Sequence, residues 1–242
     1  MTYSSNASRL QDLGLHGFLA ALERQQISPP SLELCFDDRL AAMIDAEVAD
    51  REAKRFKRYL DAAKFKVAAY PEHIRFSPDR NLDRAMTADI LTCGWIAKNL
   101  NGIITGASGT GKTWLACAFG IEAARHGLPV LYHRTSLLLE TLSTAHLDGS
   151  IKRERARLAK ARLLILDDFG LAKLNSRGVQ DLLEILDARV GRSSTIIAGQ
   201  MPFESWHDFI GDPAMADAIL DRVAHSSFRL CLTGESLRRM KS

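Results

Sequence analysis

The chain has 242 residues, of which 46% are hydrophobic and 25% are charged, and its formal net charge is +3. These values are typical of folded globular proteins and exclude disordered and collagen-like chains, while the lack of any run of about 20 apolar residues excludes a membrane span. The N-terminus has no apolar signal segment, and the four cysteines form no Cys-x-x-Cys pair, so we expect a soluble, cytoplasmic protein.

The first 70 residues predict an all-helical domain, because they lack the alternation typical of strands. Pro29 and Pro30 separate a short helix from a long one. Along the long helix, apolar residues at helical spacing predict a buried face: Ala42, Ala49, Ala53, Phe56, Leu60 and Ala63. Basic residues gather on another face: Arg51, Lys54, Arg55 and Arg58. The irregular stretch 71–80 predicts a linker, and 81–242 predicts a second domain.

Within 81–242, short β-branched runs alternate with longer helical ones, which is typical of a parallel sheet covered by helices. The five predicted strands are Gly102–Thr105, Val130–His133, Leu163–Asp167, Thr195–Ala198 and Phe228–Leu232. A helix is predicted over 113–126, ended by Gly127 and by Pro129 just beyond.

The string GASGTGKT at 106–113 lies between the first strand and this helix and matches the phosphate-loop pattern G-x4-G-K-[ST]. Its glycines let successive backbone N–H groups face a phosphate, Lys112 supplies a cation, and Thr113 offers a hydroxyl to Mg²⁺. A glycine-rich turn without a ligand is the alternative. The expected nucleotide-binding residues are Gly106, Ala107, Ser108, Gly109, Thr110, Gly111, Lys112, Thr113 and Trp114. We therefore expect ATP and Mg²⁺ as cofactors.

Two carboxylates, Asp167 and Asp168, follow the buried run 163–166, at the strand end where parallel sheets bind ligands. We expect Asp167 to hold Mg²⁺ through water and Asp168 to orient or deprotonate the attacking water. A solvated acidic turn is the alternative.

Four further residues are candidates for contacts with the phosphates. Gln200 follows the fourth strand, which we expect between the first and third, so its amide would lie near the γ-phosphate; an ordinary loop glutamine is the alternative. Arg222, in the helix before the last strand, is a candidate arginine finger acting on a neighbouring subunit, or a solvated helix arginine. Arg238 and Arg239 are candidates for a phosphate sensor within the chain, or part of a basic tail.

The insertion between the second and third strands, roughly Ser136–Arg162, is strongly basic. Its cations are candidates for contacts with a DNA backbone: Lys152, Arg153, Arg155, Arg157, Lys160 and Arg162. A solvated helical face is the alternative. Aromatic residues are absent from the basic stretch, so stacking on single-stranded bases has little support.

Longer strings add specificity: LGLHGFLAALERQ, FDDRLAAMIDAEVADRE and AKFKVAAYPEHIRF in the first part, then NLDRA, GASGTGKT, LLILDDFG, WHDFIGDPAMADAILDRVAH and GESLRR. With these strings the chain resembles, over nearly its whole length, the IstB family of insertion-sequence helper ATPases, close to the DnaC-type helicase loaders of the AAA+ group. The resemblance implies an α/β AAA+ P-loop NTPase with a five-stranded parallel sheet in the order 5-1-4-3-2 and an N-terminal all-helical domain.

The resemblance also implies a function: ATP-dependent assembly of a homo-oligomer on double-stranded target DNA, and delivery of that DNA to a partner transposase. The helical domain would serve partner contact and self-assembly. Two departures from the AAA+ pattern occur. Asp168 stands where many members have glutamate, which suggests slow, switch-like turnover, and IAGQMP replaces the commoner Ser-Gln or Ser-Asn form at Gln200.

Two other functions stay open at this point. A replicative helicase loader would differ in the partner of residues 1–70 and in a preference for single strands. A P-loop small-molecule kinase would need an acceptor pocket and a lid, and would leave Gln200 and the basic insertion unexplained.

Overall fold

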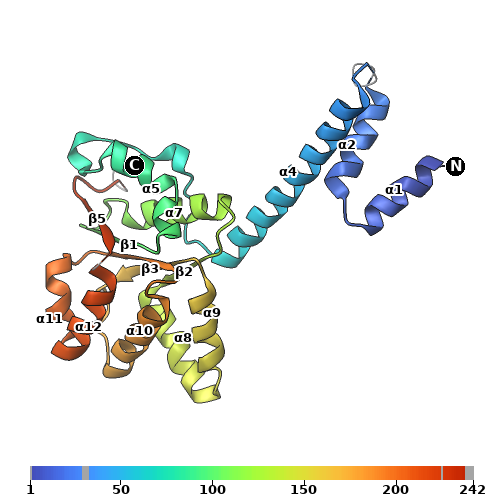
Figure 1. Ribbon diagram of the computed structural model, residues 1–242. Coiled ribbons are helices and arrows are strands. Elements are labelled where there is room, and N and C mark those ends of the chain that lie inside the picture. The colour runs from blue at the N-terminus through green and yellow to red at the C-terminus, as the bar shows by residue number, and fades with distance from the viewer. Residues whose placement is uncertain (1, 29–32, 225, 238–242) are drawn as a thin grey trace. The chain divides into compact units, whose positions relative to one another are not determined.

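The structure is a computed structural model that describes residues 2–28, 33–224 and 226–237 (Figure 1). It divides into two compact units, Met1–Arg58 and Tyr59–Ser242. Among the described residues, no helix is long and apolar enough to cross a membrane.

The first unit is helical, as predicted. It contains α1 (Thr2–Asp12), α2 (His16–Ile27) and most of α4 (Phe36–Ala63), whose last five residues belong to the second unit. Gly17 allows α2 to approach α4 closely, since a Cβ at Gly17 would collide with the backbone of α4. At the same contact the Phe18 N–H donates to Glu47 Oε2 at 3.1 Å, and Glu47 pairs with Arg51 at 2.6 Å.

The predicted apolar face of α4 is only partly correct. Of the predicted residues, Phe56 and Leu60 are half-buried and Ala63 is buried, but Ala42, Ala49 and Ala53 are exposed. Met43 and Glu47 are buried there instead. Small alanines bury little area, so the approach through Gly17, rather than the apolar spacing, decides which face of α4 meets α2.

The second unit is built on a five-stranded parallel sheet in the order β2-β3-β4-β1-β5, the reverse listing of the predicted 5-1-4-3-2. The strands are β1 (Asn101–Gly106), β2 (Val130–Arg134), β3 (Leu163–Phe169), β4 (Ser194–Gly199) and β5 (Ser227–Leu232). Each predicted strand is therefore confirmed, with β4 between β3 and β1. The carboxyl ends of β1, β3 and β4 consequently meet at one edge of the sheet.

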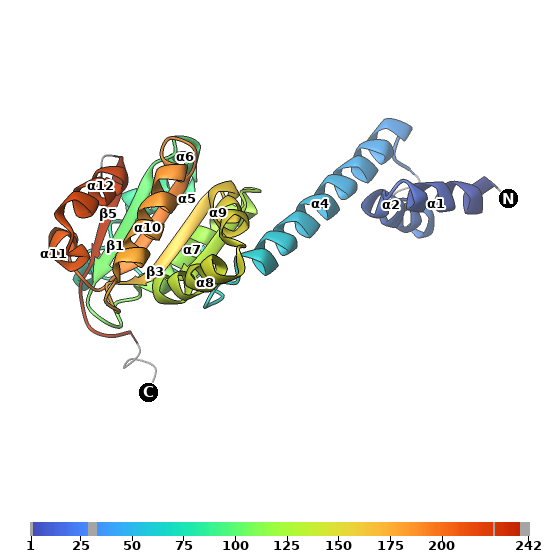
Figure 2. The same cartoon turned by 90° about the horizontal axis from the view of Figure 1, so that it is seen from below.

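Helices cover both faces of this sheet (Figures 1 and 2). Those on the α7 face are α5 (Arg84–Leu91), α6 (Gly94–Ala97) and α7 (Lys112–Arg125). Those on the opposite face are α8 (Thr135–Asp148), α9 (Ile151–Lys160), α10 (Ser176–Arg189), α11 (Trp206–Ile210) and α12 (Pro213–Ala224). The described part of the unit also contains three 3-10 turns: η1 (Pro71–His73), η2 (Pro78–Arg80) and η3 (Phe203–Ser205).

Local signals fix the ends of several helices. Asp83 caps α5 by accepting the Met86 N–H at 2.6 Å, and Asn175 caps α10 by accepting the Gly178 N–H at 2.7 Å. Gly127, with φ of 74°, ends α7 where the sequence predicts. These contacts satisfy backbone groups that would otherwise lack partners at helix ends.

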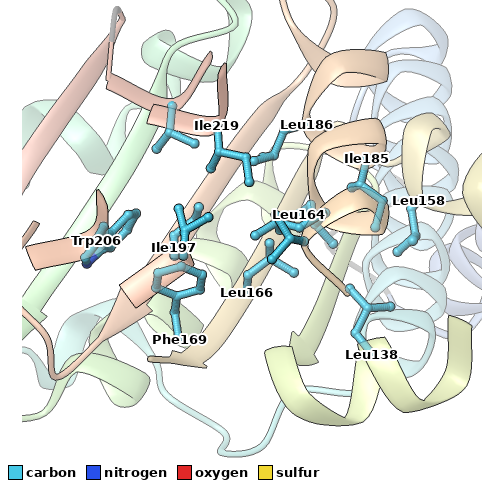
Figure 3. Close-up of a cluster of buried hydrophobic side chains, with 14 of the residues drawn as sticks. Leu138, Leu158, Leu164, Leu166, Phe169, Ile185, Leu186, Ile197, Trp206 and Ile219 are labelled. Atoms are coloured by element: carbon cyan, nitrogen blue, oxygen red, sulfur yellow. The ribbon is translucent and has the colours of Figure 1, made fainter. Parts of the chain in front are cut away.

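One cluster of buried hydrophobic side chains lies between the sheet and α8, α10 and α12. Figure 3 shows Leu164, Leu166 and Ile197 of the strands facing Leu186 of α10 and Ile219 of α12. All five side chains are buried, and each contributes about 2 kcal/mol through removal of apolar surface from water.

One cation lies inside this core. The Arg189 guanidinium is 1% exposed and donates to the carbonyls of Leu158, Ala161 and Ser194 and to Thr195 Oγ1. Burial lowers the pKa of Arg189 to about 9, which leaves it charged at neutral pH. Arg189 thereby ties the C-terminal end of α9 to the start of β4.

The boundary between the two units lies at Arg58/Tyr59, earlier than the linker predicted at 71–80. The residues between the boundary and the linker pack on the second unit: the Phe65 ring lies 6.4 Å from the Tyr132 ring, and Ala69 is fully buried. Within 71–80, the η1 turn contacts α7. Residues 59–80 are thus part of the second unit.

Candidate nucleotide site

The phosphate loop connects β1 to α7, as predicted. Gly109 and Gly111 have φ of 85° and 94°, which L-residues with a Cβ rarely adopt. These conformations turn the backbone between the strand and the helix. The Lys112 ammonium is largely buried and donates to the Ala107 carbonyl at 2.7 Å, across the loop. A loop of this shape offers amides and a cation to an anion at the N-terminus of α7.

The structure brings the two predicted metal ligands together. Asp167 is 1% exposed, and its Oδ2 accepts the Thr113 hydroxyl at 2.8 Å. The same oxygen accepts the Tyr132 hydroxyl at 2.6 Å, and the Asp167 carbonyl accepts the Thr135 hydroxyl at 2.9 Å. No group of three or more His, Cys, Asp or Glu that could hold a metal is found in the described part of the chain.

This donor set suits Mg²⁺ bound together with phosphates. One carboxylate and one hydroxyl leave most of an octahedral shell to water and phosphate oxygens, which is how Mg²⁺ is usually held beside nucleotides. Thr113 and Asp167 would hold the ion, which would neutralise charge on the phosphates.

Asp168 adopts an unusual backbone conformation, with φ of 58°. It lies at an irregularity in the pairing of β3 with β4, between Leu166 and Phe169. Aspartate tolerates the left-handed region better than most residues with a side chain, and glutamate lacks this tolerance. The backbone therefore gives a physical reason for aspartate where the AAA+ pattern often has glutamate.

A cleft of about 530 Å³ gathers these groups. From the predicted site it is lined by Ser108, Gly109, Gly111, Lys112, Thr113, Trp114, Asp168 and Gln200. The position of Gln200 beside the phosphate loop agrees with the order of the strands. The remaining lining residues were not predicted from the sequence: Lys66, Val67, Ala68, His73, Arg75, Arg80 and Leu237.

Two of these additional residues hold the phosphate loop from outside. Arg80, 7% exposed, donates to the Thr110 carbonyl at 3.0 Å and lies so close to Gly111 that a Cβ there would be 2.9 Å from its guanidinium. Leu237 donates its N–H to the Gly109 carbonyl at 3.0 Å. Both contacts link distant segments, so no local pattern in the sequence indicates them.

Comparison with known proteins identifies the family. The model of the IstB-like ATP binding protein family matches residues 8–242. The chain belongs to this family. It is 41% identical over 231 residues, 96% of this chain and 94% of the relative, to a Sinorhizobium fredii (strain NBRC 101917 / NGR234) protein named as an insertion sequence ATP-binding protein, y4pL.

Solved structures agree on the AAA+ fold of this IstB-like protein. The DnaC helicase loader has a TM-score of 0.58 at 19% identity, covering 73% of this chain and 99% of that one. A DNA replication initiation factor also has a TM-score of 0.58 at 19% identity, covering 72% of this chain, which spans only about half (52%) of that protein. The fold inferred from the resemblance is confirmed.

The sequence does not predict Tyr132 as a residue of the site, because Tyr132 resembles the other apolar residues of β2. Burial and the neighbouring Asp167 raise its pKa, so the phenol stays a hydrogen-bond donor to that carboxylate. We expect Tyr132→Phe to lower the free energy of unfolding by about 2 kcal/mol, because a buried charged acceptor loses a donor. Urea unfolding would measure this, with the exposed Tyr70→Phe as control. Equal losses in the two variants would contradict the role given to Tyr132.

Arg222 does not line the cleft of its own chain. It is held on α12 by Asp187 of α10, at 2.7 and 2.8 Å, and it donates to the Ala218 carbonyl. Its action on a neighbouring subunit stays a prediction, which requires the Asp187 pair to open. Arg238 and Arg239, the other candidate sensors, lie outside the described residues.

The six predicted DNA contacts separate into two groups. Arg155 pairs with Asp181 and Glu184 of α10, Arg157 pairs with Glu154 at 2.9 Å, and Arg162 donates to the carbonyls of Arg192 and Ile96. These three arginines have structural partners. Lys152 and Lys160 are exposed on α9, and Arg153, which lies 3.8 Å from Glu154, has a side chain that is 79% exposed. These three are the better candidates for contact with an anionic partner.

Arg157 also makes the stability of this chain sensitive to pH through its contact with His133. The Arg157 guanidinium lies 3.3 Å from His133 Nε2, and only a neutral imidazole can accept from it. Burial, with Arg157 and Lys64 adding to it and Glu154 opposing it, lowers the pKa of His133 to about 4.

The unfolded chain therefore binds more protons than the folded one between pH 4 and the ordinary histidine value of about 6.5. We expect stability to fall as pH is lowered through this window, and His133→Gln to reduce this slope. Thermal unfolding at pH 4.5, 5.5 and 7 would measure it, with the exposed His16→Gln as control. An unchanged slope in His133→Gln would contradict the assignment.

Proposed function

We propose that this chain is a Mg²⁺-dependent ATPase of the cytoplasm that assembles as a homo-oligomer on double-stranded DNA and delivers that DNA to a partner transposase. The main support for ATPase activity is that Thr113 of the phosphate loop contacts Asp167. Asp168 and Gln200 line the cleft beside them. Membership of the IstB-like family supports ATP as the nucleotide.

Each residue of the cleft then has a role. Lys112 and the loop amides bind the β and γ phosphates, and Thr113 with Asp167 holds Mg²⁺. Asp168 accepts a proton from the attacking water, and Gln200 orients that water or reports loss of the γ-phosphate. Arg222, released from Asp187, completes the site of a neighbouring subunit.

DNA contact is assigned to Lys152, Arg153 and Lys160 of α9. Each phosphate that they neutralise releases counterions, so affinity should fall steeply with salt and depend little on sequence. The name of the S. fredii relative refers to an insertion sequence, which supports transposition as the process and a transposase as the partner.

We expect Lys152→Ala/Lys160→Ala to weaken duplex binding and to lower the slope of log affinity against log salt by about 2 for each subunit in contact. Fluorescence anisotropy at several salt concentrations would measure this. The control is Lys98→Ala/Arg192→Ala, which removes two exposed cations elsewhere in the ATPase unit. Equal weakening by both pairs would assign the binding to net charge rather than to α9.

The experiment that tests the whole proposal measures ATP hydrolysis with and without duplex DNA and examines the product by electron microscopy. Stimulated hydrolysis with rings or filaments on duplex supports it. A helicase loader, favoured by the fold shared with DnaC, would prefer single strands and capture a helicase instead of a transposase in a pull-down. A P-loop small-molecule kinase would ignore DNA and stay small.

A further inference from the structure

The carboxylate of Asp168 is shared by two cations from different parts of the chain. Its Oδ2 accepts from Arg134 Nε, at the end of β2, at 2.9 Å, and from Lys66 Nζ at 3.4 Å. The Asp168 side chain is only 19% exposed, so these ion pairs are partly shielded from water. One oxygen of the proposed general base is thus occupied from two sides.

Lys66 belongs to a short segment, residues 64–70, that we call the strap. The strap follows α4 and lines the nucleotide cleft with Lys66, Val67 and Ala68. Phe65 packs on the Tyr132 ring and against α7 at Gly120, where a Cβ would be 2.5 Å from the Phe65 ring. Because the strap is anchored on both sides of Lys66, by Phe65 and by the buried Ala69, the ammonium is directed at the cleft.

We propose that Lys66 is a positioning residue for hydrolysis, which restrains Asp168 by ion pairing and must release it before the carboxylate can accept a proton from water. This inference rests on the proposed ATPase. A carboxylate oxygen that already accepts from two cations has fewer lone pairs for the water proton, so the paired arrangement is the less active one.

The position of Lys66 in the chain allows this restraint to be controlled from α4. Only Lys64 and Phe65 separate Lys66 from the last residue of α4, Ala63. The strap therefore begins six residues after Arg58, the last residue of the helical unit, and it passes the general base. A partner or a second copy that binds α4 and displaces it can weaken the Lys66–Asp168 pair, because α4 and Lys66 are close neighbours in the chain.

The test compares Lys66→Met with Lys66→Arg, which keeps the charge, in the full-length chain. The control is Lys98→Met, which removes an exposed cation outside the cleft. Steady-state ATP hydrolysis with Mg²⁺ gives kcat and KM separately. We expect Lys66→Met to raise kcat about five-fold and to leave KM unchanged. A change of this size in rate corresponds to the free energy of a partly exposed ion pair. Lys66→Arg and Lys98→Met should keep the wild-type kcat.

A second measurement does not depend on hydrolysis. A thermal-unfolding cycle of Lys66→Met, Asp168→Asn and the double variant should give non-additive shifts in Tm if the two side chains interact. Additive shifts, or a kcat for Lys66→Met that is unchanged or lower, overturn the restraint. If coupling is found but wild type hydrolyses ATP no faster than Lys112→Ala, the ATPase itself is wrong, and the pair is a structural contact only.

Discussion

Lys112→Ala is expected to weaken ATP binding about 100-fold and to leave the chain folded. The ammonium lies inside the phosphate loop, held by the Ala107 carbonyl, where its charge-assisted bonds to phosphate contribute about 3 kcal/mol. Removal of its charge from a partly buried position also removes a desolvation cost, so the unfolding free energy should change little. Titration with a fluorescent ATP analogue and Mg²⁺ would measure the affinity.

The matched control for this variant is Lys98→Ala, which should bind ATP as wild type does. If ATP is required for assembly, Lys112→Ala should also fail to form oligomers on duplex DNA. An affinity within about three-fold of wild type would contradict the assignment of the cleft to the phosphates. Because each ten-fold change corresponds to about 1.4 kcal/mol, such an affinity would mean that Lys112 contributes far less than expected.

The parts of the fold that could be predicted are those with a local signal. Each strand is a short apolar run, and the phosphate loop and Asp167 directly follow such runs, so residues near in sequence define them. The order of the strands then brings Gln200 to the same edge of the sheet.

The contacts that could not be predicted join segments far apart in the chain. Arg80 and Leu237 meet the phosphate loop, Tyr132 meets Asp167, and Lys66 meets Asp168 across 102 positions. A single lysine or tyrosine among many carries no sign of such a partner. For the same reason the basic run 151–162 reads as one surface, although Arg155 pairs with α10 and Arg162 donates to carbonyls of distant segments.

Asp168→Asn is expected to lower kcat about 100-fold or more while ATP still binds. Asparagine is nearly the same size and tolerates the left-handed conformation seen here, so the strand end should keep its shape. The amide cannot accept a proton from water, and a positioned general base contributes about 100-fold or more to the rate. The exposed Asp208→Asn is the matched control.

The effect of Asp168→Asn on the complex with DNA distinguishes a switch-like protein from a motor. With ATP bound and not hydrolysed, Asp168→Asn should stay on duplex DNA, so its complex should dissociate more slowly than that of wild type after dilution into competitor DNA. Lys112→Ala should fail at the earlier step, because it does not bind ATP. If both variants assemble on and leave DNA as wild type does, nucleotide state does not control the DNA complex, and the coupling proposed between the cleft and DNA is wrong.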